Sequence, residues 1–279
     1  MIKHYESESL GSFDYDDEIF EIAKDIFDTD FLHLKDGYKG PIDLPDGCIN
    51  TSCIFASCDL TGCYLRNFDT SNVVDMSGMF ANCKMPKGFS LGKKFNTSNV
   101  KDMYCMFNGC KMPEGFSLGD NFDTSNVTDM CSMFHRCKMS ECFTLGNKFN
   151  TLNVINMSHM FSECEMPEGF SLGDNFDTSN VKIVAFMFSG QYYKKLKIPK
   201  GFSFGNKFNI SNVEDVCGML NYCIIPDDFS FGNVLKEISA KKPEGSDEMF
   251  FDCKYESGKV IDNSIFQEQI TDKNIGEEI

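Results

Sequence analysis

The hydrophobic positions in the middle of the chain recur with a fixed period. Five phenylalanines lie 27 residues apart, and these are Phe68, Phe95, Phe122, Phe149 and Phe176. Phe208 follows after 32 residues, so that unit carries an insertion of five residues. A period of about 20–50 residues is typical of stacked repeats, in which each unit buries its apolar face against the next. We therefore expect a repeat solenoid with rungs of 27 residues rather than a globular enzyme core.

Each unit contains one helical pattern and one extended pattern. Apolar residues spaced by three and four predict one face of a short helix, formed by Met76, Met79, Phe80 and Cys83. The segment 88–92 alternates apolar and small residues between two glycines, which predicts a short strand, and 68–73 is a second extended candidate. We therefore expect each rung of the solenoid to combine short parallel β-strands with a short helical turn.

One asparagine recurs at the same place in every unit. These residues are Asn72, Asn99, Asn126, Asn153, Asn180 and Asn212. In a stack of rungs they would form a ladder in which each amide donates to one rung and accepts from the next, satisfying buried polar groups. We expect this ladder to be structural.

The charge divides the chain into three parts. The whole chain of 279 residues has a net charge of −16, and residues 1–47 carry 13 acidic and 4 basic side chains. Residues 236–279 carry 11 acidic and 6 basic side chains, whereas 48–235 is almost neutral. We expect an acidic N-terminal cap (1–47), the repeat solenoid (48–235) and an acidic C-terminal cap and tail (236–279). Within the solenoid, 48–67 forms a first coil and about six rungs follow.

The first cap contains one predicted helix, and the composition excludes several classes of partner. Residues 14–28 read as an amphipathic helix that covers the first rung, since open repeat ends need caps. The acidic balance argues against nucleic acid as the main partner. No apolar run approaches the ~20 residues of a membrane helix. The start shows no secretory pattern, so we expect the cytoplasm by default, with a virion or cell surface reached by another route as the alternative.

Four cysteines precede the first repeat phenylalanine at a strict spacing of five, namely Cys48, Cys53, Cys58 and Cys63. Structural zinc sites usually use closer pairs separated by a longer stretch, so the even spacing favours inward-facing positions of a tight coil. Cysteine packs at such positions as a small apolar residue. A metal site and disulfides are the alternatives, and without a secretory signal we expect reduced thiols.

Catalytic motifs are absent from the sequence. The four histidines are His4, His33, His135 and His159, and no nucleophilic triad order, phosphate loop or HExxH pattern includes them. His135 and His159 fall at different places in adjacent units, so we do not expect them to stack. We expect no enzyme activity, no cofactor and no metal.

The five-residue insertion is the best candidate for a binding surface. It reads Gln191, Tyr192, Tyr193, Lys194 and Lys195. Tyrosine next to cationic residues resembles a protein interface in composition. An ordinary bulging loop is the alternative interpretation.

The repeat unit resembles a known family. The segments FDTSNVVDMSGMFANC (68–83), FNTSNVKDMYCMFNGC (95–110) and FDTSNVTDMCSMFHRC (122–137) are similar to the BspA-like bacterial surface protein repeats, related to leucine-rich repeats and common in mycoplasmas. The resemblance covers about residues 65–235. It implies a leucine-rich-repeat-like solenoid with a non-catalytic binding role, often adhesion at a cell surface.

We therefore expect a non-catalytic repeat scaffold that mediates protein–protein interaction, adhesin-like or partner-binding. The sequence does not identify the partner, and self-assembly is a further prospect. The main alternative is a structural subunit of a larger assembly such as a virion or surface layer. A minor alternative is a metal-binding protein that uses Cys48–Cys63.

Overall fold

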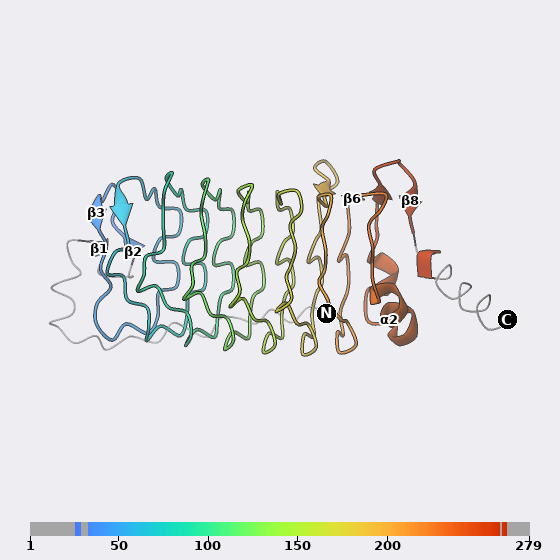
Figure 1. Cartoon of the computed structure of the whole chain (residues 1–279), viewed down its shortest axis with the longest axis horizontal. Helices are drawn as coiled ribbons and strands as arrows, with labels where there is room; N and C mark the ends of the chain where they lie inside the picture. Colours follow the sequence, from blue (N-terminus) through green and yellow to red (C-terminus); the bar gives the residue numbers. More distant parts are fainter. Residues whose placement is uncertain (1–25, 29–32, 263, 267–279) are drawn as a thin grey trace.

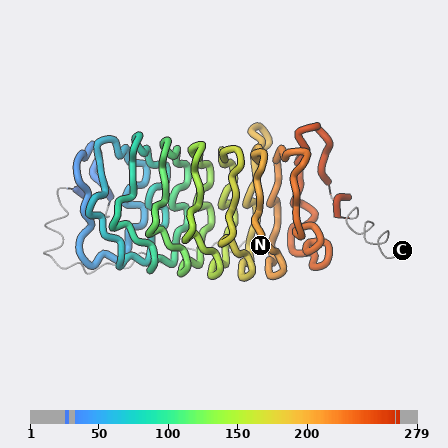
Figure 2. The backbone as a smooth tube through the Cα atoms, viewed as in Figure 1, coloured from blue at the N-terminus to red at the C-terminus, as the bar shows by residue number. Residues whose placement is uncertain are grey.

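The chain winds as a stack of coils, each of which is one pass of the repeat. The computed structural model describes residues 26–28, 33–262 and 264–266. Its coils lie side by side along the long axis of the molecule, as Figure 1 and the tube in Figure 2 show. Parallel bridges join equivalent positions of neighbouring coils, for example Asp75 with Asp102 and Asp102 with Asp129. The stack thus places residues 27 positions apart next to one another.

Named strands lie towards the two ends of the described chain. At the start, β1 (Phe27–Asp28) pairs antiparallel with β2 (His33–Leu34), and β3 (Gly40–Pro41) pairs parallel with β4 (Cys63–Tyr64). Towards the other end a four-stranded sheet has the order β5 (Leu196–Lys197), β6 (Cys223–Ile225), β7 (Cys253–Tyr255) and β8 (Val260–Ile261). The first three of these strands are parallel, and β8 is antiparallel to β7. In this order β5 is an edge strand, which matters for the site below.

The C-terminal part carries the helical elements of the described chain. The helix α2 (Val234–Lys241) buries Val234, Leu235 and Ile238, and the 3-10 helix η1 (Ser246–Glu248) follows it. The expected N-terminal helix over 14–28 lies almost wholly outside the described residues. Its last two residues form β1, so the helix prediction is wrong at that end.

The short helix expected in each unit does not form. Met79 N donates to Met76 O at 3.2 Å, which closes a tight turn, but Gly78 N between them donates to Tyr104 O of the next coil at 2.7 Å. A helix would instead direct every amide to a carbonyl four residues earlier. Gly78 and Asn82 have φ angles of 60° and 53°, which a right-handed helix excludes. The apolar residues spaced by three and four therefore belong to consecutive tight turns of a coil.

The strand expected over 88–92 is likewise not formed. Phe89 N donates to Pro86 O at 3.0 Å within its own coil, so this amide does not pair with a neighbouring coil. Pairing occurs instead at single bridge positions, such as Lys111 with Lys138. Short contacts of this kind, rather than extended ladders, join most coils of the stack.

Three columns of phenylalanine rings fill the interior. Equivalent rings stack one coil apart, with centroids 6.4 Å apart for Phe95 and Phe122 and 5.7 Å apart for Phe107 and Phe134. A third column meets the second edge-to-face, as Phe107 and Phe116 do at 6.1 Å. Each aromatic pair contributes about 0.5–1.5 kcal/mol beyond its buried area. The core therefore runs as a continuous rod along the axis of the stack.

Candidate functional site

The recurring asparagines lie on the surface of the stack. All six are exposed, and five of them donate to a main-chain carbonyl of the preceding coil. For example, Asn99 Nδ2 donates to Ser71 O and Asn126 Nδ2 donates to Ser98 O, both at 2.7 Å. The asparagines thus donate to a neighbouring coil as the ladder prediction expected, but the prediction that they satisfy polar groups in the interior is wrong because these side chains are exposed.

A threonine column forms the buried polar ladder instead. Thr70, Thr97, Thr124, Thr151 and Thr178 are each fully buried. Thr124 Oγ1 donates to Asn150 O at 2.8 Å and accepts from Asn150 N at 2.8 Å, so one hydroxyl satisfies both main-chain groups of a residue in the next coil. The sequence signal was the threonine two places after each of the first five repeat phenylalanines, which the asparagine hypothesis did not consider.

A column of buried thiols runs beside the phenylalanines. Cys110, Cys137 and Cys164 each donate through Sγ to a phenylalanine carbonyl of the preceding coil at 2.8 Å. Burial raises the pKa of the Cys110 thiol to about 12 and holds the pKa of Cys137 well above its ordinary value. All 14 cysteines are free thiols. A raised pKa keeps these thiols protonated, and because the thiolate is the reactive form, they are unreactive.

The four early cysteines do not converge. Cys48 Sγ donates to Asn50 O and Cys63 Sγ donates to Tyr38 O, each at 3.2 Å. Cys53 is exposed, with a φ of 56°, so the expectation that all four face inward is wrong for this residue. Across the described ranges, no three His, Cys, Asp or Glu side chains gather as a metal ion would require.

The two repeat histidines lie close together without stacking. The rings of His135 and His159 meet edge-to-face with centroids 6.1 Å apart, although their places in the unit differ. Burial lowers the pKa of both imidazoles. The nearest carboxylate, Glu163, lies 3.8 Å from His135 Nε2 but forms two hydrogen bonds with the Arg136 guanidinium at 2.9 and 3.2 Å. Glu163 is thus the ion-pair partner of Arg136 rather than of the two histidines.

The five-residue insertion forms a tight loop that projects from the stack, and we call residues 191–195 the tyrosine loop. Gln191 N donates to Lys194 O at 2.9 Å and Lys194 N donates to Gln191 O at 3.1 Å, so Tyr192 and Tyr193 stand at the tip. Their side chains are 78% and 84% exposed. The Tyr192 ring meets that of Tyr222 edge-to-face, with centroids 6.3 Å apart.

Ion pairs fix the base of the tyrosine loop on both sides. Lys194 Nζ lies 3.2 Å from Glu165 in the preceding coil, and Lys195 Nζ lies 2.6 Å from Asp252 in a coil beyond the loop. Lys195 Nζ also donates to Asp252 O at 3.0 Å. The two aromatic side chains are therefore presented on an anchored loop.

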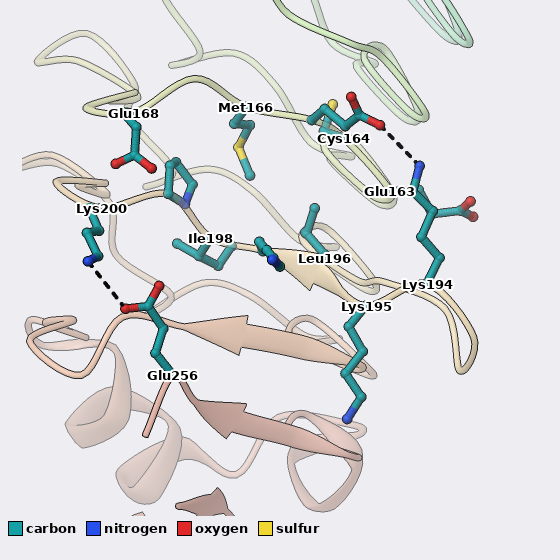
Figure 3. A pocket seen from close by; sticks show the side chains of 13 residues that line it. Glu163, Cys164, Met166, Glu168, Lys194, Lys195, Leu196, Ile198, Lys200 and Glu256 are labelled. Atoms are coloured by element: carbon teal, nitrogen blue, oxygen red, sulfur yellow. Dashed lines mark hydrogen bonds and ion pairs between the residues drawn. The ribbon is translucent and has the colours of Figure 1, made fainter. Parts of the chain in front are cut away.

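A cavity of about 480 Å³, which we call the loop groove, opens beside the tyrosine loop. Its floor is apolar and includes Met166 from one coil and Leu196 and Ile198 from the next (Figure 3). Its charged lining, the rim, is divided between coils: three glutamates come from the coil of Met166, four lysines come from the next coil, and Glu256 comes from the coil beyond; these are Glu163, Glu165 and Glu168, and Lys194, Lys195, Lys197 and Lys200. The sequence predicted the loop but gave no signal for this cavity.

The two coils on either side of the loop groove lack a main-chain hydrogen bond that other coils make. In the preceding coils Met112 N donates to Lys138 O and Met139 N donates to Glu165 O, at 2.9 and 3.0 Å. Within the described chain, no equivalent bond joins Met166 N to the following coil. Met166 is only part-buried, whereas Met112 and Met139 are buried.

The rim charges are mostly paired. Glu165 lies between Lys138 at 2.7 Å and Lys194 at 3.2 Å, and these hydrogen-bonded ammonium groups lower its pKa. Lys200 lies 3.8 Å from Glu256. Among the described residues, Lys197 and Glu168 have no opposite charge within ion-pair distance. The loop groove therefore has one unmatched cation and one unmatched anion.

Comparison with known proteins places the chain in a family. A family model described as "Mycoplasma protein of unknown function, DUF285" matches residues 49–168, 117–223 and 144–263. These ranges together cover more than half of the chain and all of the regular coils. The chain belongs to the DUF285 family. No curated protein and no solved structure matches it. In the part of this DUF285 chain that the structure describes, no helix is both long and apolar enough to span a bilayer.

Proposed function

We propose that this DUF285 chain is a non-catalytic scaffold that binds a partner protein at the tyrosine loop and the loop groove. We further propose that its coil stack is a solenoid of the BspA-like, leucine-rich-repeat-related type. The 27-residue period and the parallel bridges between successive coils support the second part. The geometry of the insertion supports the first.

The observation that carries the proposal is the pair of exposed tyrosines on an anchored loop. Tyr192 and Tyr193 interrupt a stack whose other aromatic rings lie mainly in the core. Tyrosine is enriched among the few residues that carry most of the binding energy at protein interfaces. The mixed lysine and glutamate rim matches the polar border that surrounds such a centre.

The test is a pull-down from source cells with the tagged full chain and two variants. The first variant is Tyr192→Ser/Tyr193→Ser, and the matched control is Tyr104→Ser, since Tyr104 is also exposed (48%) but lies on a regular coil. Loss of hot-spot tyrosines typically costs about 2 kcal/mol, which weakens binding about 30-fold.

We expect the wild-type chain and the control to retain the same stoichiometric protein and the double variant to lose it. If all three chains retain the same protein equally, the partner binds at another surface of the chain. Recovery of many copies of the chain itself, with a large native mass, would instead favour the structural-subunit alternative.

A further inference from the structure

We propose that the loop groove receives an extended segment of the partner protein, which adds as a strand beside β5. This inference rests on the proposed function, because it names the kind of chain that the loop groove binds. Strand addition takes its affinity from main-chain hydrogen bonds and its selectivity from pockets for alternate side chains. The loop groove contains both features.

The first wall is the free edge of β5. Leu196 N donates to Tyr222 O at 3.0 Å and Ile198 N donates to Ile224 O at 2.9 Å, so both amides point towards β6. Main-chain groups of a strand alternate in direction, so the N–H and C=O of Lys197 point away from β6 and towards the loop groove. β5 is the outermost strand of its sheet. An incoming strand would therefore find one donor and one acceptor here.

The second wall is the coil segment that contains Met166. Glu165 N donates to Cys137 O at 2.8 Å and Glu165 O accepts from Met139 N, so the main chain of Glu165 is committed to the preceding coil. By the same alternation, Met166 N–H faces the following coil, and among the described residues no hydrogen bond joins it to that coil. Both walls thus present unused main-chain groups to the space between them.

The floor and rim define the chemistry of the bound segment. Met166, Leu196 and Ile198 offer an apolar floor for every second side chain of an extended peptide (Figure 3). The intervening side chains would face the rim, where the unmatched ammonium of Lys197 favours a carboxylate. The segment that fits is an extended peptide with an apolar residue next to an aspartate or glutamate.

The two ends of the loop groove limit the length of that segment. Glu163 N donates to Ser189 O at one end and Gly169 N donates to Lys200 O at the other, each at 2.8 Å. Between these bonds the open wall spans only residues 164–168. The bound segment is accordingly short, and the tyrosine loop would contact the partner surface that flanks it.

The probe for the test is a random linear peptide library displayed on phage, selected on the full chain. Peptides retained by a variant that lacks residues 191–195 are removed, because that deletion restores the 27-residue spacing and is expected to remove the loop groove. The selected peptides are then synthesised and their affinities measured. Two variants of one residue are compared: Lys197→Pro lacks the N–H that points into the loop groove, whereas Lys197→Ala keeps it.

Strand addition predicts a specific pattern of losses. Lys197→Pro should weaken the selected peptides about fivefold or more, beyond any effect of Lys197→Ala. Methylation of the peptide main-chain nitrogens should weaken binding at alternate positions only, because alternate N–H groups face the wall. Thermal melting and circular dichroism of both variants establish that the coil stack is intact.

Other outcomes overturn strand addition and leave the proposed function to its own test. Selected peptides that bind Lys197→Pro as tightly as Lys197→Ala, or that tolerate methylation at every position, would show side-chain recognition alone. Failure of the full chain to retain any peptide would also refute the inference. A dimer in solution that Lys197→Pro dissociates would assign the loop groove to a second copy of the chain.

Discussion

The threonine column makes the sharpest prediction about stability. Thr124 is fully buried, and its hydroxyl both donates to Asn150 O and accepts from Asn150 N. The substitution Thr124→Val keeps the volume of the side chain but removes the hydroxyl. Asn150 then has an unpaired N–H and an unpaired C=O at the junction of two coils.

The size of the effect follows from the cost of unpaired polar groups. Each buried main-chain group without a partner costs about 1–3 kcal/mol, so two such groups should cost about 2–4 kcal/mol after some relaxation. The control Thr124→Ser keeps the hydroxyl and removes one methyl group, which costs about 0.8 kcal/mol. Valine should therefore destabilise the chain more than serine, although valine is the more hydrophobic residue.

The assay is urea unfolding followed by circular dichroism. With a slope of about 2–3 kcal/mol per molar urea, the valine variant should lower the midpoint by about 1 M and the serine variant by much less. Amide exchange at Asn150 should accelerate in the valine variant. A valine midpoint equal to the wild type, or a serine variant less stable than valine, would refute the role given to the hydroxyl.

Three further predictions concern other parts of the stack. Deletion of 191–195 should leave the melting temperature equal or higher, because the coils then pair without a gap; a large decrease in calorimetry would contradict the account of the loop groove. Burial and neighbouring carboxylates raise the pKa of Asp102, so the folded chain favours the protonated carboxyl and loses stability as pH rises through that pKa. Asp102→Asn should therefore increase the free energy of unfolding at pH 7 and give no such increase in acid. Urea midpoints measured against pH check this, and a gain in acid that disappears at pH 7 would contradict it. In the folded chain a thiol reagent should modify exposed Cys53 and spare Cys137; mass spectrometry showing equal labelling would contradict the packing.

The periodicity of the sequence predicted which residues stack but not the shape of the coil. Phe95 and Phe122 are equivalent in the sequence and lie in contact in the structure. The helix prediction failed at Gly78 and Asn82 because a spacing of three and four is shared by helices and by consecutive tight turns with left-handed residues. A helix and a run of tight turns differ only in where every second main-chain N–H donates, and here it donates to the next coil.

The candidate site was predictable in part. The break in the period identified the tyrosine loop, and its exposure follows from the extra length of that unit. The loop groove could not be predicted, because it depends on how far apart the main chains of Met166 and Lys197 lie, which no residue type in these segments indicates. Asn99 was assigned to the interior because it recurs, but recurrence marks any position that repeats a contact, including one on the surface.

The central claim is that a partner protein contacts the tyrosine loop, and site-specific photo-crosslinking tests it most directly. A photoreactive phenylalanine derivative replaces Tyr193 in one chain and Tyr104 in a control chain, and both are irradiated in source cells. The account predicts one dominant adduct with a different protein from position 193 and none from position 104. The same adducts from both positions, or adducts of the chain with itself alone, would contradict it.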